Sequence, residues 1–210
     1  MSLELPDAQP GLPAHPTRRS SELAEEKAQL NVSHSDDDTY ITSLNKMAWD
    51  YVERVTGRSL ITRSWRIVTD FPEGYGPSAA IALPVSPVVA VTTVAYYDTD
   101  GDAQTTTAFL AQDGDEAYIW PSAGAAWPET DRNRLSPVTV TFTAGYDGTA
   151  DSPVDLTEIP DSITQAMLLH IAHMYENREA VNVGTSSSVK PVTIPMGYEA
   201  LIAPYVVRTF

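Results

Sequence analysis

The chain has 210 residues, of which 42% are apolar and 20% are charged, a composition typical of a globular protein with a buried core. The absence of cysteine excludes disulfide bonds, a thiolate nucleophile and cysteine-based metal sites. The formal net charge of −15 is spread along the sequence without a basic patch, which argues against tight binding of nucleic acid through its phosphates.

The N-terminal part of the sequence predicts an arm followed by two helices. Residues 1–19 contain four prolines and little periodicity, so we expect a flexible or docked arm outside the core. Helix signals then fill residues 20–58. The first helix opens at a serine pair, and the second begins at an acidic run, carries apolar residues every three or four positions and ends at Gly57.

The middle of the chain, residues 60–150, predicts a β-rich insertion. The apolar stretch 79–97 is interrupted by Pro84 and Pro87, which suits two strands around a turn and not a membrane span. A β-branched run that leads into Asp100-Gly101 is typical of a hairpin. Alternating segments before and after this hairpin predict further strands.

The C-terminal part is again helical. Residues 158–181 predict a helix that begins at Pro160 and Asp161, and residues 182–210 predict a loop and a short helix, a tail suited to docking. The predicted fold is therefore α+β: a helical bundle of two N-terminal and two C-terminal helices, with a β-rich insertion in the middle of the chain.

Two groups of residues have the spacing of metal ligands, but a simpler interpretation exists for each. Asp98, Asp100 and Asp102 alternate as in a calcium loop, yet glycine falls at the fourth position of that loop and not the sixth, so a β-turn suffices. His170 and His173 are three residues apart with Glu176 three further on, but His170 lies on the apolar stripe of the helix. We expect no metal, no cofactor and no catalytic residue, although a carboxylate pair defined only in space stays open.

Three tryptophans offer an alternative function. Trp65, Trp120 and Trp127 lie in the β-rich part, and aromatic side chains can bind the faces of sugars. A carbohydrate-binding module of a particle or secreted protein is therefore a second hypothesis. It predicts a change in tryptophan fluorescence on addition of a saccharide.

The order of short motifs over residues 21–206 resembles the head–tail connector (adaptor) family of tailed bacteriophages and gene transfer agents. The resemblance rests on the segments AWDYVERVTGRSLITRSW, VTVTFTAGYDG, YENREAV and ALIAPY, in that order. It implies a structural protein and not an enzyme. The expected place is the head–tail junction of a virion or phage-like particle, after assembly in the host cytoplasm.

The same resemblance implies the partners. Members of the family form a ring under the portal vertex, expected to be twelvefold, which extends the DNA channel. The implied partners are other copies of the chain, the portal protein and a tail-side stopper or head-completion protein. Double-stranded DNA would pass through without specific binding, which agrees with the acidic composition.

Two sets of residues are candidates for contacts in such a ring. A charged and aromatic segment at the end of the long C-terminal helix is interpreted as a subunit interface or its immediate support, against the alternative of a solvated helix end. Its residues are Tyr175, Glu176, Asn177, Arg178 and Glu179. Anchors for portal docking are expected in the tail, against the alternative of a helix folded on its own core. They are Tyr198, Leu201, Ile202, Tyr205 and Phe210.

Overall fold

A computed structural model describes residues 2–4, 20–146, 159–178, 181–182, 190–191 and 196–207. The chain divides into two compact units. The β unit comprises Met1–Pro16, Gly57–Asp151 and Val207–Phe210, and the helical unit comprises Thr17–Thr56 and Ser152–Val206. The predicted α+β class is confirmed, because strands occupy the middle of the chain and helices lie on both sides of it in sequence.

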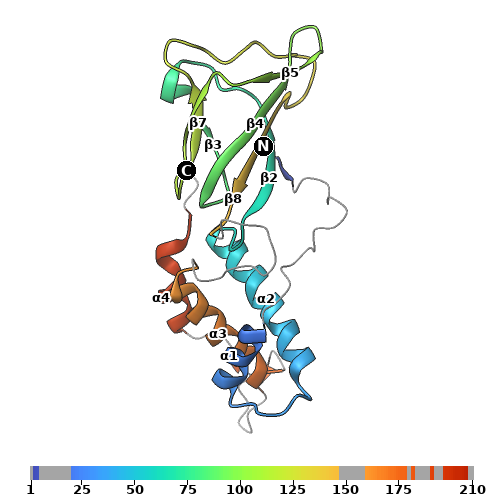
Figure 1. Cartoon of the computed structure of the whole chain (residues 1–210), viewed down its shortest axis with the longest axis vertical. Helices are drawn as coiled ribbons and strands as arrows, with labels where there is room; N and C mark the ends of the chain where they lie inside the picture. Colours follow the sequence, from blue (N-terminus) through green and yellow to red (C-terminus); the bar gives the residue numbers. More distant parts are fainter. Residues whose placement is uncertain are drawn as a thin grey trace. The chain divides into compact units, whose positions relative to one another are not determined.

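In the described residues of the helical unit, four α-helices are present, and Figure 1 labels them. They are α1 (Ser20–Leu30), α2 (Asp38–Thr56), α3 (Asp161–Glu176) and α4 (Met196–Ile202), which continues into a 3₁₀ turn (Ala203–Tyr205). Helix α3 packs against the other three helices. A short antiparallel pair, β9 (Val181–Asn182) with β10 (Lys190–Pro191), lies in the segment predicted as loop.

The apolar stripe predicted for α2 forms its buried face. Ile41, Leu44, Ala48 and Val52 are buried, and Leu44 and Ala48 pack with Ile171 of α3. Burial of each such aliphatic side chain contributes about 1.5–3 kcal/mol, so this stripe is what fixes α2 in the bundle. Thr56 ends the helix, and Gly57 follows with a φ of +69°, as its C-terminal position predicts.

Polar contacts connect α1 to α2. Lys27 Nζ lies 2.7 Å from Asp38 Oδ1, and the amide of Asn45 donates to the carboxylate of Glu26. Glu26 is buried, and a buried carboxylate needs hydrogen-bond donors to offset its desolvation. These contacts therefore determine how α1 lies on α2.

The described residues of the β unit form two antiparallel sheets that share one core, and Figure 1 shows their strands. The larger sheet has the order β1-β2-β8-β4-β5, with β1 (Ser2–Glu4), β2 (Arg63–Thr69), β4 (Val88–Tyr97), β5 (Ala103–Thr106) and β8 (Val138–Ala144). The smaller sheet has the order β3-β7-β6, with β3 (Ile81–Ala82), β6 (Phe109–Gln112) and β7 (Tyr118–Pro121). A 3₁₀ turn, η1 (Gly76–Ala79), precedes β3.

In strand β8, the alternation of apolar and polar residues matches the alternation of buried and partly exposed side chains. Every second residue of it is buried, namely Val138, Val140, Phe142 and Ala144. Val140 lies opposite Ile67 of β2 and Val94 of β4, so one face of the sheet forms the core. Strand β1, in the segment predicted as an arm, pairs with β2 through Ser2 and Val68.

The predicted hairpin joins β4 to β5 through the turn 98–102. The carboxylate of Asp98 accepts the side-chain amide of Gln104 at 2.9 Å and the backbone N–H groups of Asp100 and Asp102 at 3.1 and 2.9 Å. These bonds, that of Gln104 first, hold the pKa of Asp98 below its usual range. With Gly101 at a φ of +85°, the Asp-Gly pair makes a turn, as predicted.

Trp127 belongs to the core, which contradicts its interpretation as a sugar platform. Its side chain is buried, its indole N–H donates to the carbonyl of Ala79 at 2.8 Å, and its ring stacks on Phe71 at 4.5 Å. A ring covered on these sides has no face for a saccharide. The carbohydrate-binding hypothesis loses one of its three tryptophans for this reason.

A buried arginine connects three segments of the β unit. Arg58 is 6% exposed, and its Nη1 donates to Asp115 Oδ1 at 2.6 Å and to the Tyr146 hydroxyl at 2.8 Å. The hydrogen bond from Arg58 lowers the pKa of Asp115, which is itself largely exposed. Arg58 directly follows Gly57, so this contact fixes the start of the β unit.

Candidate functional site

The segment predicted as a subunit interface begins where α3 ends. The last helical residue is Glu176, and Asn177 has left the helix with φ −114° and ψ 72°. Its backbone N–H and its side-chain amide both donate to the carbonyl of His173, at 3.0 and 2.9 Å. The sequence predicted a helix that continues past Asn177. Asn177 and Arg178 are not helical, because Asn177 caps the helix, so this prediction is wrong for these two residues. Glu179 lies outside the described residues.

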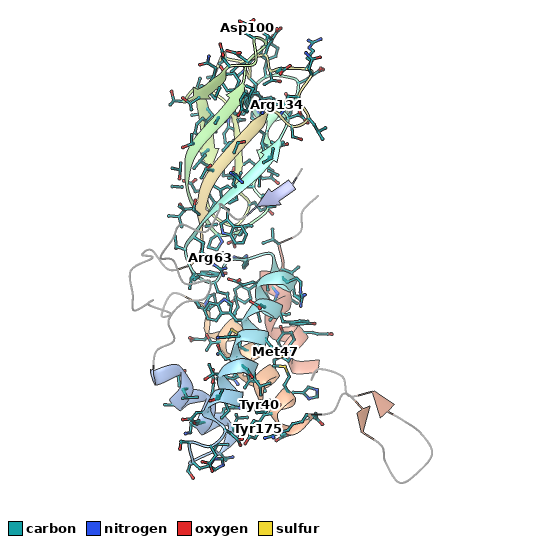
Figure 2. The ribbon with its side chains drawn as sticks, turned by 90° about the vertical axis from the view of Figure 1, so that its right-hand side faces the viewer. Tyr40, Met47, Arg63, Asp100, Arg134 and Tyr175 are labelled. Atoms are coloured by element: carbon teal, nitrogen blue, oxygen red, sulfur yellow. The ribbon has the colours of Figure 1, made fainter. Side chains whose placement is uncertain are left out.

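Side chains on either side of the cap lie against the start of α2. The Tyr175 hydroxyl donates to Asp37 Oδ2 at 2.5 Å, and Arg178 Nη2 lies 3.7 Å from Asp37 Oδ1. The Arg178 guanidinium lies 4.6 Å from the centre of the Tyr40 ring, whose centre is 6.0 Å from that of Tyr175. Figure 2 shows Tyr40 and Tyr175 close together in the helical unit. We call Asp37, Tyr40, Tyr175 and Arg178 the α2–α3 cluster.

The interactions within the α2–α3 cluster contribute little to the free energy of folding and mainly hold its side chains in one orientation. The hydrogen bond to Asp37 raises the pKa of Tyr175, so its hydroxyl stays a donor at neutral pH. The Arg178 side chain is 58% exposed, and an ion pair at such a surface contributes only about 0–1 kcal/mol. Stacking over an exposed aromatic ring adds a similarly small amount, about 0.5–1 kcal/mol. The cluster therefore mainly orients a half-exposed guanidinium.

Sequence reasoning identified only half of this cluster. It singled out Tyr175 and Arg178 but used the acidic run 36–38 only as a helix start. One signal was available: three consecutive aspartates exceed the need of one helix start, and Asp37 and Tyr40 are three residues apart, a spacing that brings side chains together on a helix. Glu176, also predicted for the subunit interface, is exposed.

The residues predicted to dock to the portal differ in how far their side chains are exposed. Tyr198 is 1% exposed and Ile202 is 4% exposed, so these two side chains hold α4 on its own unit and are unavailable as anchors. Leu201 and Tyr205 are half-buried, and Phe210 lies outside the described residues. For Tyr198 and Ile202, the alternative of a helix folded on its own core is the correct one.

Tyr198 packs in an aromatic group with His170 and Tyr51. The ring centres of Tyr198 and His170 are 5.2 Å apart, and those of His170 and Tyr51 are 5.0 Å apart. His170 is buried, and burial lowers its pKa, with the nearby His173 as a second cause. His170 is thus a neutral core residue. Among the described residues, no group of three or more potential ligands could hold a metal ion.

No helix in the described part of the chain is long and apolar enough to cross a membrane.

Comparison with known proteins supplies the context for this geometry. The family model described as "Phage gp6-like head-tail connector protein" matches residues 20–109, which include α1, α2 and the strands β2 to β5. The predicted resemblance to head–tail connectors is confirmed. No curated protein matches the chain.

Solved structures match over the whole length. A chain in the "Neck of empty GTA particle computed with C6 symmetry" is 24% identical, with a TM-score of 0.68. A chain in the "Virion of native gene transfer agent (GTA) particle" is 23% identical, with a TM-score of 0.68. A third, in the "Neck of native GTA particle computed with C12 symmetry", is 26% identical, with a TM-score of 0.66. Each match covers 100% of this chain and 98% of the other.

Both kinds of comparison agree with the predicted role. The family model is one of head–tail connectors, and the matched chains belong to particle necks and a virion. They support the prediction of a structural connector at the head–tail junction of a phage-like particle.

Proposed function

We propose that this protein forms a ring of identical subunits at the head–tail junction of a phage-like particle, where it extends the DNA channel and offers an attachment surface to a tail-side protein. The observation that carries the proposal is the full-length match to chains of particle necks, two of which were computed with C6 and C12 symmetry. A twelvefold ring fits both symmetries, because a twelvefold axis contains a sixfold one.

In this ring the α2–α3 cluster supports the subunit contact. A head-to-tail ring repeats one contact at every interface, so a small contribution per contact recurs around the ring. Arg178 is suited to such a contact because Asp37 and Tyr40 hold its guanidinium in place while 58% of the side chain stays exposed. Less side-chain freedom is then lost when a neighbour binds. Glu176 and Glu179 complete the proposed surface.

Docking to the portal is assigned to the side of the tail that its own unit does not cover. Leu201 and Tyr205 are half-buried, and Phe210 follows them in the sequence. Tyr198 and Ile202 are buried and pack α4 against its own unit. Aromatic and leucine side chains at a partly covered surface are suitable anchors in an interface. The net charge of −15 supports passage of DNA without tight phosphate contacts, since each contact would slow its movement.

Charge reversal at the cluster tests the subunit contact. Arg178→Glu places a carboxylate beside Asp37, so we expect loss of rings from particle necks, with a melting temperature within about 3 °C of the parent protein because the side chain is exposed. Lys46→Glu is the matched control, an equal charge change at an exposed position of α2, and should leave rings intact. Rings that persist in Arg178→Glu would remove the cluster from the interface.

A further inference from the structure

Loops from three parts of the sequence meet at one end of the β unit. Strand β2 ends at Thr69, opposite Val138 at the start of β8, and Val138 in turn pairs with Tyr96 near the end of β4. The segments 70–80, 98–102 and 122–137 therefore leave or enter the sheets at the same end, and we call them the tip loops. Figure 2 shows Asp100 and Arg134 at this end.

The second half of one tip loop, residues 128–137, is held in place by several contacts. The backbone N–H of Asp131 donates to the carbonyl of Tyr97 at 3.0 Å, and the N–H of Tyr97 donates to the carbonyl of Pro137 at 3.1 Å. The Asp131 carboxylate accepts the N–H of Asn133 at 2.9 Å. The Arg134 guanidinium lies 3.5 Å from the centre of the Tyr97 ring. These contacts hold the loop against Tyr97 at the end of β4.

This ordered loop exposes a leucine. Leu135 is 93% exposed, and the following residue, Ser136, has a φ of +50°, a backbone conformation that costs free energy for a serine. A single exposed leucine is ordinary, but here the backbone is ordered and strained where it presents one. Another tip loop carries Tyr75, which is 74% exposed. Neither side chain contributes to the core of its own unit.

Charge distinguishes between possible partners for this end. The tip loops carry seven carboxylates and two guanidinium groups. One of the two, Arg134, already lies on Tyr97. Two copies that met through their tip loops would bring carboxylates together and repel each other, whereas a basic surface would be attracted.

We propose that the tip loops form a docking surface, with Leu135 as its apolar centre, for a different protein that offers an apolar pocket edged by lysine or arginine. The acidic groups around the leucine would guide that protein and set its specificity. Rigid presentation reduces the freedom that Leu135 loses on binding. The surface is separate from the α2–α3 cluster, so it does not depend on the ring contact proposed above.

A photo-crosslinking residue at position 135 of the full chain, in cells that assemble particles, tests the proposal. We expect an adduct with a particle protein other than this chain, bound through a segment rich in lysine or arginine. The matched control carries the crosslinker at Val89, which is 49% exposed near the opposite end of β4, and should not give this adduct. An adduct with a second copy, or no adduct in assembled particles, would overturn the proposal.

Binding of the purified full chain to the crosslinked partner supplies the second measurement. Leu135→Ser should weaken binding about tenfold or more, as for a residue at the centre of an interface, without a change in folding because the side chain is exposed. Asp100→Asn with Asp102→Asn should weaken it roughly two- to fivefold per charge, and Arg132→Ala should strengthen it. The opposite signs would identify an acidic partner and contradict the proposal. Rings should be intact in Leu135→Ser; their loss would assign this surface to the subunit contact.

Discussion

The buried packing of Tyr198 predicts that two substitutions at this position change the free energy of unfolding in opposite directions. Its ring is buried at 1% exposure between His170 and Tyr51, but its hydroxyl has no hydrogen-bond partner among the described residues. Removing the whole ring and removing only the hydroxyl should therefore change the free energy of unfolding in different directions. Tyr198→Ala and Tyr198→Phe make these two changes.

The magnitudes follow from burial. Loss of a buried aromatic ring costs about 3–5 kcal/mol. A buried unpaired hydroxyl costs about 1–3 kcal/mol, and this cost is absent from the alanine variant, which has no hydroxyl. Taking the unpaired hydroxyl at about 1 kcal/mol, we expect Tyr198→Ala to lose about 2–4 kcal/mol and Tyr198→Phe to gain about 1 kcal/mol. Tyr75→Ala, the same truncation at a tyrosine that is 74% exposed, should change little.

Urea denaturation followed by far-UV circular dichroism measures these differences, and hydrogen exchange of α4 locates them. In Tyr198→Ala, amides of α4 should exchange faster before the rest of the helical unit opens. A loss of stability in Tyr198→Phe of more than about 1 kcal/mol would show that the hydroxyl is paired, and would refute the reasoning. A negligible effect of Tyr198→Ala would show that α4 is not packed on its own unit.

Three further predictions follow. The folded-state pKa of His170 is lowered, so the unfolded chain takes up its proton first as the pH falls. The stability that neutral His170 contributes should be present above about pH 6.5 and lost below it. His170→Phe should remove this part of the pH dependence in urea titrations between pH 5 and 8, and an unchanged profile would exclude His170 as its source. Arg58→Ala should cost about 1–3 kcal/mol through its two hydrogen bonds from a charged donor, measured by thermal unfolding, and a neutral result would show that these bonds are not formed in solution. Trp127→Ala should cost about 3–5 kcal/mol, and saccharides should not alter tryptophan fluorescence of the parent protein; such a change would revive the sugar-binding hypothesis.

The sequence predicted the elements that its periodicity encodes. The stripe of α2 and the alternation in β8 each repeat with the period of one regular structure, and the hairpin is marked by the Asp100-Gly101 pair at its turn. All three form as predicted. Strand β3 lies in the stretch 79–97, where two strands were predicted, but the short strands β6 and β7 were missed because four residues are too few to show a period. The same holds for the 3₁₀ turn before β3.

The candidate sites were harder to predict than the fold, for a physical reason. Tyr175 and Asp37 are 138 positions apart, so only the packing of α3 on α2 brings them together. The end of α3 was misplaced because the two hydrogen bonds of Asn177 outweigh the helix preference of the residues that follow. Tyr198 looked like an interface anchor because aromatic residues serve equally well in cores and interfaces, and composition does not distinguish the two.

The most direct test of the proposed ring is cryo-electron microscopy of particles that carry this chain with a small fused label after Phe210. The account predicts a closed ring of identical labelled subunits at the head–tail junction, with twelve copies around the DNA channel and the label absent from other parts of the particle. A labelled chain in a single copy, or located on the capsid surface or the tail fibres, would contradict the proposed function.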